Sequence, residues 1–142
     1  MRIKYNFGLL KGLDVGFIHE DNTRGFHGIL QNVKKINGGY RFIYENHYIE
    51  ISEDIFQNSL IELKDDILIF KPISEPIISG IFVFTMYDTY GFPMEITKEI
   101  IEEKGLKIDE NGFNILKQVQ KNKTKNTFKN KNAFERGEHI SE

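Results

Sequence analysis

The sequence contains no cysteine and no tryptophan, and only three of its 142 residues are proline. Without cysteine, disulfides and thiolate metal sites are excluded, and a secreted scaffold held by disulfides is not expected. No apolar run approaches the roughly 20 residues that a membrane-spanning helix needs. Residues 1–7 alternate polar and apolar side chains and lack the apolar stretch of a signal peptide. We therefore expect a soluble, cytoplasmic protein that does not associate with membranes.

The net charge is also small, −2 at neutral pH, so the whole chain has no strong attraction for a polyanion. The charges are nevertheless segregated, because acids are concentrated in residues 95–110 and none occurs between Glu110 and Glu135. This basic stretch could contact phosphates, or it could be a solvated and disordered end. Its lysines are Lys117, Lys121, Lys123, Lys125, Lys129 and Lys131.

Residues 1–72 show short β segments separated by turn residues, such as Asn37-Gly38-Gly39, which favours a hairpin. This spacing predicts a small β-barrel-like module of the SH3 or OB kind, partly open, with a helical turn at 53–57. The expected strands are 2–7, 13–18, 26–34, 39–45, 47–51 and 66–70.

One face of the predicted β module is aromatic, because Tyr40, Phe42 and Tyr44 alternate with other residues at a period of two. Such a stripe could stack nucleic-acid bases, as on some OB-like modules. An aromatic stripe on a small barrel is more often part of the core, and we favour that interpretation.

A change of pattern after Pro72 divides the chain. Residues 73–78 read as a linker, and residues 79–126 show helical periodicity. Pro93 is placed to be the first residue of a helix that stops at Gly105, and Asp109 can cap a second helix containing Phe113. We therefore predict an α+β protein, in which a helical hairpin follows the β module and residues 127–142 form a flexible tail.

The run from Ser79 to Pro93 ends in Tyr87-Asp88-Thr89-Tyr90-Gly91-Phe92-Pro93, which resembles a segment of alanyl-tRNA synthetases. The resemblance continues through Gly105, Asp109 and Phe113 to about residue 126. No resemblance is evident in residues 1–72. In the family, the segment that starts at the equivalent of Ser79 is a helix, so the resemblance favours a helix where Ile81 to Tyr87 would otherwise read as a strand.

The resemblance implies a place in the tRNA-recognition region of the synthetase and gives Asp88 a candidate role. In the family, the matching aspartate is associated with reading a G:U wobble pair of the tRNA acceptor stem, and a carboxylate can accept a hydrogen bond from the exposed guanine amino group. The family also uses a partner residue from an earlier helix, for which this sequence shows no match. Alternatively, Asp88 only caps backbone amides at a tight turn, as aspartate commonly does.

The motifs that catalysis would require in this family are not found in the sequence. The class II ATP-binding motifs are missing, and an editing site built from histidines and a cysteine cannot be assembled. No P-loop, Gly-x-Gly-x-x-Gly or Gly-x-Ser-x-Gly pattern occurs. His19 with Glu20, Asp21 and Arg24 reads as a polar surface loop rather than a catalytic cluster. We expect no enzyme activity, no cofactor and no metal.

Three functions remain open. The first is a non-catalytic RNA-binding accessory that contacts a tRNA acceptor end, with tRNA-Ala as the candidate. The second is a protein-interaction module that mimics the synthetase and binds one of its partners. The third is a rearranged fragment without a selected function. The expected RNA-binding residues are Asp88, Lys117, Lys121, Lys123 and Lys125, and the expected structural residues are Ser79, Tyr87, Gly91, Pro93, Gly105, Asp109 and Phe113.

Overall fold

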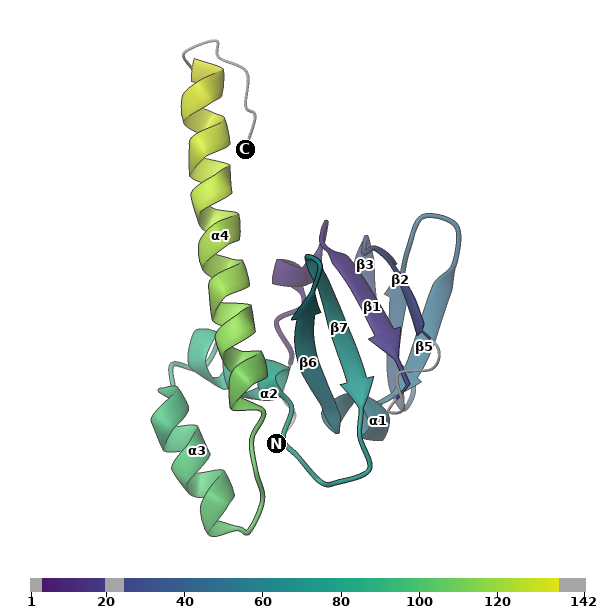
Figure 1. Cartoon of the computed structure of the whole chain (residues 1–142), viewed down its shortest axis with the longest axis vertical. Helices are drawn as coiled ribbons and strands as arrows, with labels where there is room; N and C mark the ends of the chain where they lie inside the picture. Colours follow the sequence, from purple (N-terminus) through teal and green to yellow (C-terminus); the bar gives the residue numbers. More distant parts are fainter. Residues whose placement is uncertain (1–3, 20–24, 136–142) are drawn as a thin grey trace.

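The computed structural model describes residues 4–19 and 25–135, with residues 124–135 described by their backbone alone. Seven strands and four α-helices follow a short 3-10 helix within these ranges (Figure 1). The elements are η1 (Gly8–Leu10), β1 (Asp14–Ile18), β2 (Gly25–Ile29), β3 (Asn32–Ile36), β4 (Gly39–Ile43), β5 (Tyr48–Ser52), α1 (Glu53–Gln57), β6 (Ser59–Lys64), β7 (Ile67–Pro72), α2 (Gly80–Asp88), α3 (Met94–Glu103) and α4 (Glu110–Glu135).

The strands form two sheets, one in the order β2-β1-β7-β6 and the other in the order β3-β4-β5. The α+β class is therefore confirmed, but no closed barrel forms among the described residues. The four-stranded sheet contains a parallel pair, β1 with β7, in which Val15 lies opposite Leu68. A parallel pair needs a long connection, and β2, the three-stranded meander, α1 and β6 together supply it here.

The predicted strand 26–34 proves to be parts of two strands, because the chain changes sheets at Leu30 and Gln31. The amide of Leu30 donates to the carbonyl of Leu13 on the β1 side, and the amide of Gln31 donates to the carbonyl of Ile43 in β4. The residues of one continuous apolar pattern thus belong to two sheets. Periodicity alone could not show where the chain passes from one sheet to the other. β6 was not predicted, although Asn58, a turn-forming residue, precedes it.

The predicted strand 2–7 is wrong for its described part, residues 4–7. The amide of Asn6 donates to Oγ1 of Thr85 in α2, and the amide of Phe7 donates to the carbonyl of Tyr5. The segment is therefore held by a helix instead of a sheet. The alternation that suggested a strand reflects the packing of Tyr5 and Phe7 into the core.

The aromatic core lies between the two sheets. Rings of Phe17 and Phe42, from opposite sheets, meet edge to face at 4.9 Å, and Phe70 stacks on Phe56 of α1. Tyr40, Phe42 and Tyr44 are 4%, 0% and 3% exposed, so the core interpretation of this stripe is confirmed and base stacking by these rings is excluded. The buried hydroxyl of Tyr44 donates to the carbonyl of Val15 and so joins the sheets.

The predicted helical hairpin is wrong in its packing, although both helices exist. α4 packs mainly on α2 and β6, and α3 packs on α2, so the two predicted partners lie on different sides of α2 (Figure 1). α2 is apolar on nearly every side, and Ile81, Val83 and Phe84 are fully buried. A helix surrounded in this way is buried between its neighbours. α3 and α4 therefore each pack on α2, and an ion pair between Lys98 and Glu110 links them to each other.

The end of the chain differs in part from the predicted flexible tail. α4 continues to Glu135, well past the expected end near residue 126, and Figure 1 shows it projecting beyond the sheets. Residues 136–142 lie outside the described part. No helix in the described ranges is both long enough and apolar enough to cross a membrane.

Candidate nucleic-acid interface

Asp109 fixes the relative positions of α2, α4 and β6. Its Oδ1 accepts from the amide of Gly112 at 2.9 Å, which confirms the predicted cap of α4. Its Oδ2 accepts from the amides of Ile61 in β6 and Gly80 in α2, at 2.9 and 3.3 Å. The side chain is buried, and this burial raises the pKa of the carboxyl although the three amide bonds oppose the rise.

Two glycines allow α2 and α4 to approach so closely. A Cβ on Gly80 would lie 2.6 Å from the backbone nitrogen of Phe113, and a Cβ on Gly112 would collide with the carboxylate of Asp109. Ser79 caps α2 by accepting from the amide of Ile81, as predicted. The amino ends of α2 and α4 therefore meet at one carboxylate, and the two helices stay in contact as far as Asp88 and Gln120.

Asp88 is the last residue of α2, and its carboxylate is exposed and held by two side-chain amides. Nδ2 of Asn6 donates to Oδ2 and Nε2 of Gln120 donates to Oδ1, both at 2.7 Å. Both hydrogen bonds come from side chains. Among the described residues, no backbone amide of the turn donates to Asp88, so this residue is not the turn cap considered above. We call Asn6, Tyr87, Asp88, Lys117 and Gln120 the Asp88 cluster.

The turn after Asp88 contains the remaining predicted motif residues. Gly91 and Gly105 have φ of 77° and 79°, the left-handed conformation that favours glycine, and Gly105 ends α3 as predicted. Pro93 is the N-cap of α3 and Met94 is its first residue, so the prediction was one residue off.

Tyr87 and Phe113 support the basic side of the cluster. Their rings meet edge to face at 5.5 Å, and Nζ of Lys117 lies over the Tyr87 ring at 5.1 Å from its centre. A cation above an aromatic face is held there by the ring quadrupole. The ammonium group of Lys117 is consequently kept beside α2, one helical turn from Gln120.

The predicted basic residues of α4 have different environments. Lys121 is exposed, and it lies four residues after Lys117 on the same side of the helix. Nζ of Lys123 instead donates to the carbonyls of Leu9 and Lys11, at 3.0 and 2.7 Å, and so ties η1 to α4. Burial, together with the nearby charge of Lys11, lowers the pKa of Lys123. The side chain of Lys125 lies outside the described part.

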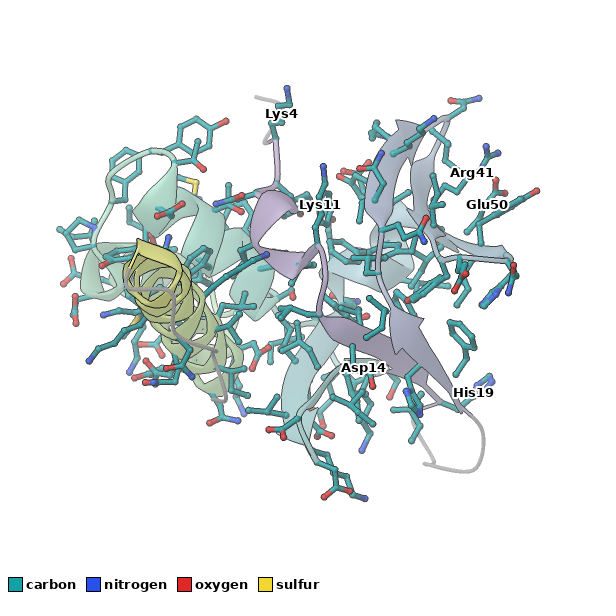
Figure 2. The ribbon with its side chains drawn as sticks, turned by 90° about the horizontal axis from the view of Figure 1, so that it is seen from above. Lys4, Lys11, Asp14, His19, Arg41 and Glu50 are labelled. Atoms are coloured by element: carbon teal, nitrogen blue, oxygen red, sulfur yellow. The ribbon has the colours of Figure 1, made fainter. Side chains whose placement is uncertain are left out.

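The N-terminal segment adds residues that the sequence did not indicate. Asn6 is 82 positions from Asp88, so no local pattern could have linked them. Figure 2 shows Lys4 and Lys11 on this segment, between the helices and the sheets. The surface around Asp88 thus combines a hydrogen-bond acceptor, two side-chain amides and the ammonium group of Lys117, from three separate parts of the chain. Such a set can contact both base edges and phosphates.

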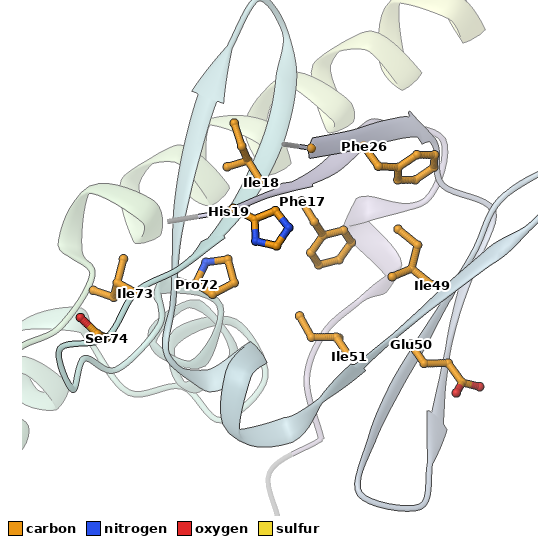
Figure 3. Close-up of a pocket in the computed structure, with 11 residues that line it drawn as sticks. Phe17, Ile18, His19, Phe26, Ile49, Glu50, Ile51, Pro72, Ile73 and Ser74 are labelled. Atoms are coloured by element: carbon orange, nitrogen blue, oxygen red, sulfur yellow. The ribbon is translucent and has the colours of Figure 1, made fainter. Parts of the chain in front are cut away.

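A wide opening of about 710 Å³ lies between the sheets, away from the Asp88 cluster (Figure 3). Its walls are mainly apolar, with Phe17, Phe26 and Ile51 facing one another and His19 at the rim. Glu20, Asp21 and Arg24, which were grouped with His19 above, lie outside the described residues. Among the described side chains, no group of three or more potential histidine, aspartate or glutamate ligands could hold a metal ion.

Comparison with known proteins extends the resemblance found in the motifs. The family described as tRNA synthetases class II (A) matches residues 37–142, which starts well before Ser79 and corrects the narrower range expected from the motifs. The alanine–tRNA ligase of Nitratidesulfovibrio vulgaris is 30% identical over 138 residues, covering 91% of this chain and 15% of the relative. That of Oleidesulfovibrio alaskensis is 28% identical over the same length and coverage.

A shorter match is more similar. The alanine–tRNA ligase of Alkaliphilus oremlandii is 40% identical over 74 residues, which is 49% of this chain and 8% of the relative. No solved structure matches the chain. The chain thus spans only a small part of these relatives. With the family matching most of its length, the chain belongs to the class II (A) tRNA synthetase family and resembles a segment of alanine–tRNA ligases.

Proposed function

We propose that this chain binds tRNA without catalysis and contacts the acceptor stem through the Asp88 cluster. The observation that carries the proposal is the way Asp88 is held. Two neutral amides, from Asn6 and Gln120, fix both oxygens of an exposed carboxylate. A carboxylate oxygen accepts more than one hydrogen bond, so each oxygen keeps a lone pair for a donor on a base.

The position of Asp88 also argues for a binding role. A negative charge at the C-terminal end of a helix is unfavourable by about 0.3–1 kcal/mol, because the helix dipole is negative there. Asp88 ends α2, and its stabilising contacts are neutral amides instead of cations. A carboxylate that is held in this place by neutral amides is well suited to accept from the amino group of guanine, the distinguishing donor of the minor groove.

Two lysines, Lys117 in the cluster and Lys121 next to it, would supply the electrostatic part of binding. Lys117 and Lys121 lie on the face of α4 that carries Gln120, and contacts of lysine with phosphate give a salt-dependent affinity. Lys123 is engaged with carbonyls of η1, so we assign it to stability instead of RNA binding. Phosphates on either side of the read base pair would then lie against α4.

The proposal of a binding role without catalysis rests on the side chains gathered around Asp88. They are a hydrogen-bond acceptor, two amides and a lysine, which can position a ligand. An aminoacylation assay with ATP, alanine and tRNA-Ala tests this directly. We expect no alanyl-tRNA above the level without protein, and turnover would contradict the proposal.

A salt-dependent titration tests the contact with the acceptor stem. We expect the chain to bind a tRNA-Ala transcript more tightly than one whose G:U wobble pair is replaced by a Watson–Crick pair. Asp88→Asn should remove most of this discrimination, a loss of about 1–3 kcal/mol, while changing the salt dependence little. Asp54→Asn, which removes an exposed acid of α1, is the matched control.

Several outcomes would contradict this proposal. If neither transcript binds at low salt, the tRNA contact is wrong. If both transcripts bind equally and Asp88→Asn has no effect, the affinity comes from the lysines alone. The proposal that Asp88 recognises the wobble pair would then be wrong. Lys117→Ala and Lys121→Ala should each reduce the salt dependence by about one phosphate contact, whereas Lys123→Ala should not.

A further inference from the structure

An apolar groove lies between α2 and α3, on a part of the helical region separate from the Asp88 cluster. Its volume is about 140 Å³, and its lining comes from α2, from the turn and from α3. Three of the lining side chains are large, apolar and strongly exposed: Phe92 at 46%, Ile96 at 48% and Ile100 at 49%. Phe82 and Met86 of α2 form the opposite wall.

Exposed apolar side chains are common singly, but a contiguous group around a groove marks an interaction site. Ile96 and Ile100 are four residues apart, so they lie in line along α3. A groove between two helices with such a row accepts the apolar side chains of a third helix. α3 has ten residues, which corresponds to a length of about 15 Å and to about three turns of a partner helix.

The charges bordering the groove indicate the chemistry of the partner. Glu95, Glu99, Glu102 and Glu103 are exposed on α3, and the helical spacing puts Glu99 and Glu103 next to Ile96 and Ile100. Among the described residues, the ion pair found on this helix joins Lys98 to Glu110 of α4. Lys98 also interacts electrostatically with Glu95 and Glu102. Glu99 and Glu103, for which the described residues show no ion pair, are thus available to cations of a partner.

We propose that the groove between α2 and α3 binds a basic amphipathic helix of another protein, with apolar residues at helical spacing and lysine or arginine along their edges. The apolar row enters the groove, and the flanking cations meet the glutamates of α3. Nucleic acid is disfavoured here, because four carboxylates repel phosphates. A second copy in the same orientation is also disfavoured, since its own glutamates would face those of the first copy.

A designed peptide serves as the probe. A fluorescent 14-residue peptide of leucine and lysine, with leucine at helical spacing, is titrated into the full chain and followed by anisotropy. We expect saturable binding that weakens as salt is raised. Two control peptides, one with the same composition in scrambled order and one with glutamate in place of lysine, should bind at least tenfold more weakly.

Variants of the chain locate the site. Ile96→Ser with Ile100→Ser should weaken peptide binding at least tenfold, and Glu99→Gln with Glu103→Gln should weaken it several-fold and reduce its salt dependence. Ile29→Ser with Leu63→Ser is the matched control, because these apolar side chains are 57% and 50% exposed elsewhere, on β2 and β6. Circular dichroism of each variant confirms that the fold is kept.

Three results would overturn the proposal. Equal binding of the scrambled or the acidic peptide would show that the groove does not select a basic helix. Equal loss in the Ile29 and Leu63 control would place binding elsewhere. If light scattering shows a dimer that Ile96→Ser with Ile100→Ser dissociates, the occupant is a second copy of this chain instead of another protein.

Discussion

Asp109 is the residue whose side chain links three elements, α2, α4 and β6. The sequence predicted it as the cap of α4, and the bond to Gly112 confirms that role. Its bonds to Ile61 and Gly80 could not be predicted, because they join residues 48 and 29 positions away. A local capping pattern can be recognised in a sequence. The second oxygen of the same carboxylate, however, accepts hydrogen bonds from β6 and α2, which only the folded structure brings close to it.

We expect Asp109→Asn to lower the free energy of unfolding by about 1–3 kcal/mol, because one of three buried amides would face an NH₂ group and lose its acceptor. Urea unfolding measures the change. Asp66→Asn is the control, since Asp66 is exposed and its positive φ of 65° is tolerated by asparagine. A loss no larger than that of the control would mean that the three bonds are not important for stability.

The difference in the free energy of unfolding between the parent chain and Asp109→Asn should depend on pH, and the sign of this dependence can be worked out. Burial raises the pKa of Asp109 in the folded state above its ordinary value of 3.8. The folded chain therefore holds this proton more tightly than the unfolded chain, and the resulting contribution is full below 3.8 and is lost as pH rises through the raised pKa. The stability of the parent chain relative to Asp109→Asn should accordingly be greatest in acid and decline toward neutral pH. A difference that grows with pH would contradict this.

Gly80 offers a test of the close approach between α2 and α4. A Cβ there would lie within 3 Å of backbone atoms of Gly112 and Phe113, which cannot move aside as a flexible side chain could. We expect Gly80→Ala to cost about 1–3 kcal/mol, measured by thermal or urea unfolding, as overpacking does. At Gly8, where an added Cβ meets one side-chain atom at 3.6 Å, alanine should change stability little.

At the scale of elements, α2 shows where the resemblance succeeded and propensity failed. Residues 81–87 are all β-branched or aromatic except Met86 and read as a strand, yet they form a helix capped by Ser79. Their apolar character comes from burial on several sides, by α4, α3 and β6, and burial overrides local propensity. The packing partners of α3 and α4 were predicted wrongly because a short connection alone does not show that a third helix lies between them.

Lys123 joins two elements that are far apart in the sequence, η1 and α4. We expect Lys123→Met to destabilise the chain by about 1–2 kcal/mol, because hydrogen bonds from a charged group to carbonyls are lost while the apolar stem is kept. Hydrogen exchange should rise most in residues 8–13. Lys121→Met, in which an exposed lysine of the same helix is replaced, should leave exchange there unchanged. Equal effects of both would show that the contact does not hold η1.

For the whole molecule, the sheets and the helices share one hydrophobic cluster, which includes Phe42 and Phe70 from the sheets and Phe84 and Leu116 from the helices. We therefore expect a single unfolding transition in urea, the same by far-ultraviolet and near-ultraviolet circular dichroism. The division predicted from the sequence, a β module over 1–72 and a helical segment over 79–126, would instead give two transitions if each part had its own core. Two separate midpoints would favour that division.

The parallel pairing of β1 with β7 also has a consequence for the order of events during synthesis. Val15 cannot meet Leu68 until more than fifty further residues have left the ribosome, whereas the β3-β4-β5 meander joins residues that are close in sequence. Contacts between distant residues form late and slow the folding of a domain. The edge of β1 that later pairs with β7 therefore stays unpaired while the rest of the chain is synthesised. A chaperone that shields the β1-β2 hairpin should raise the yield of folded protein more than a chaperone that binds α4.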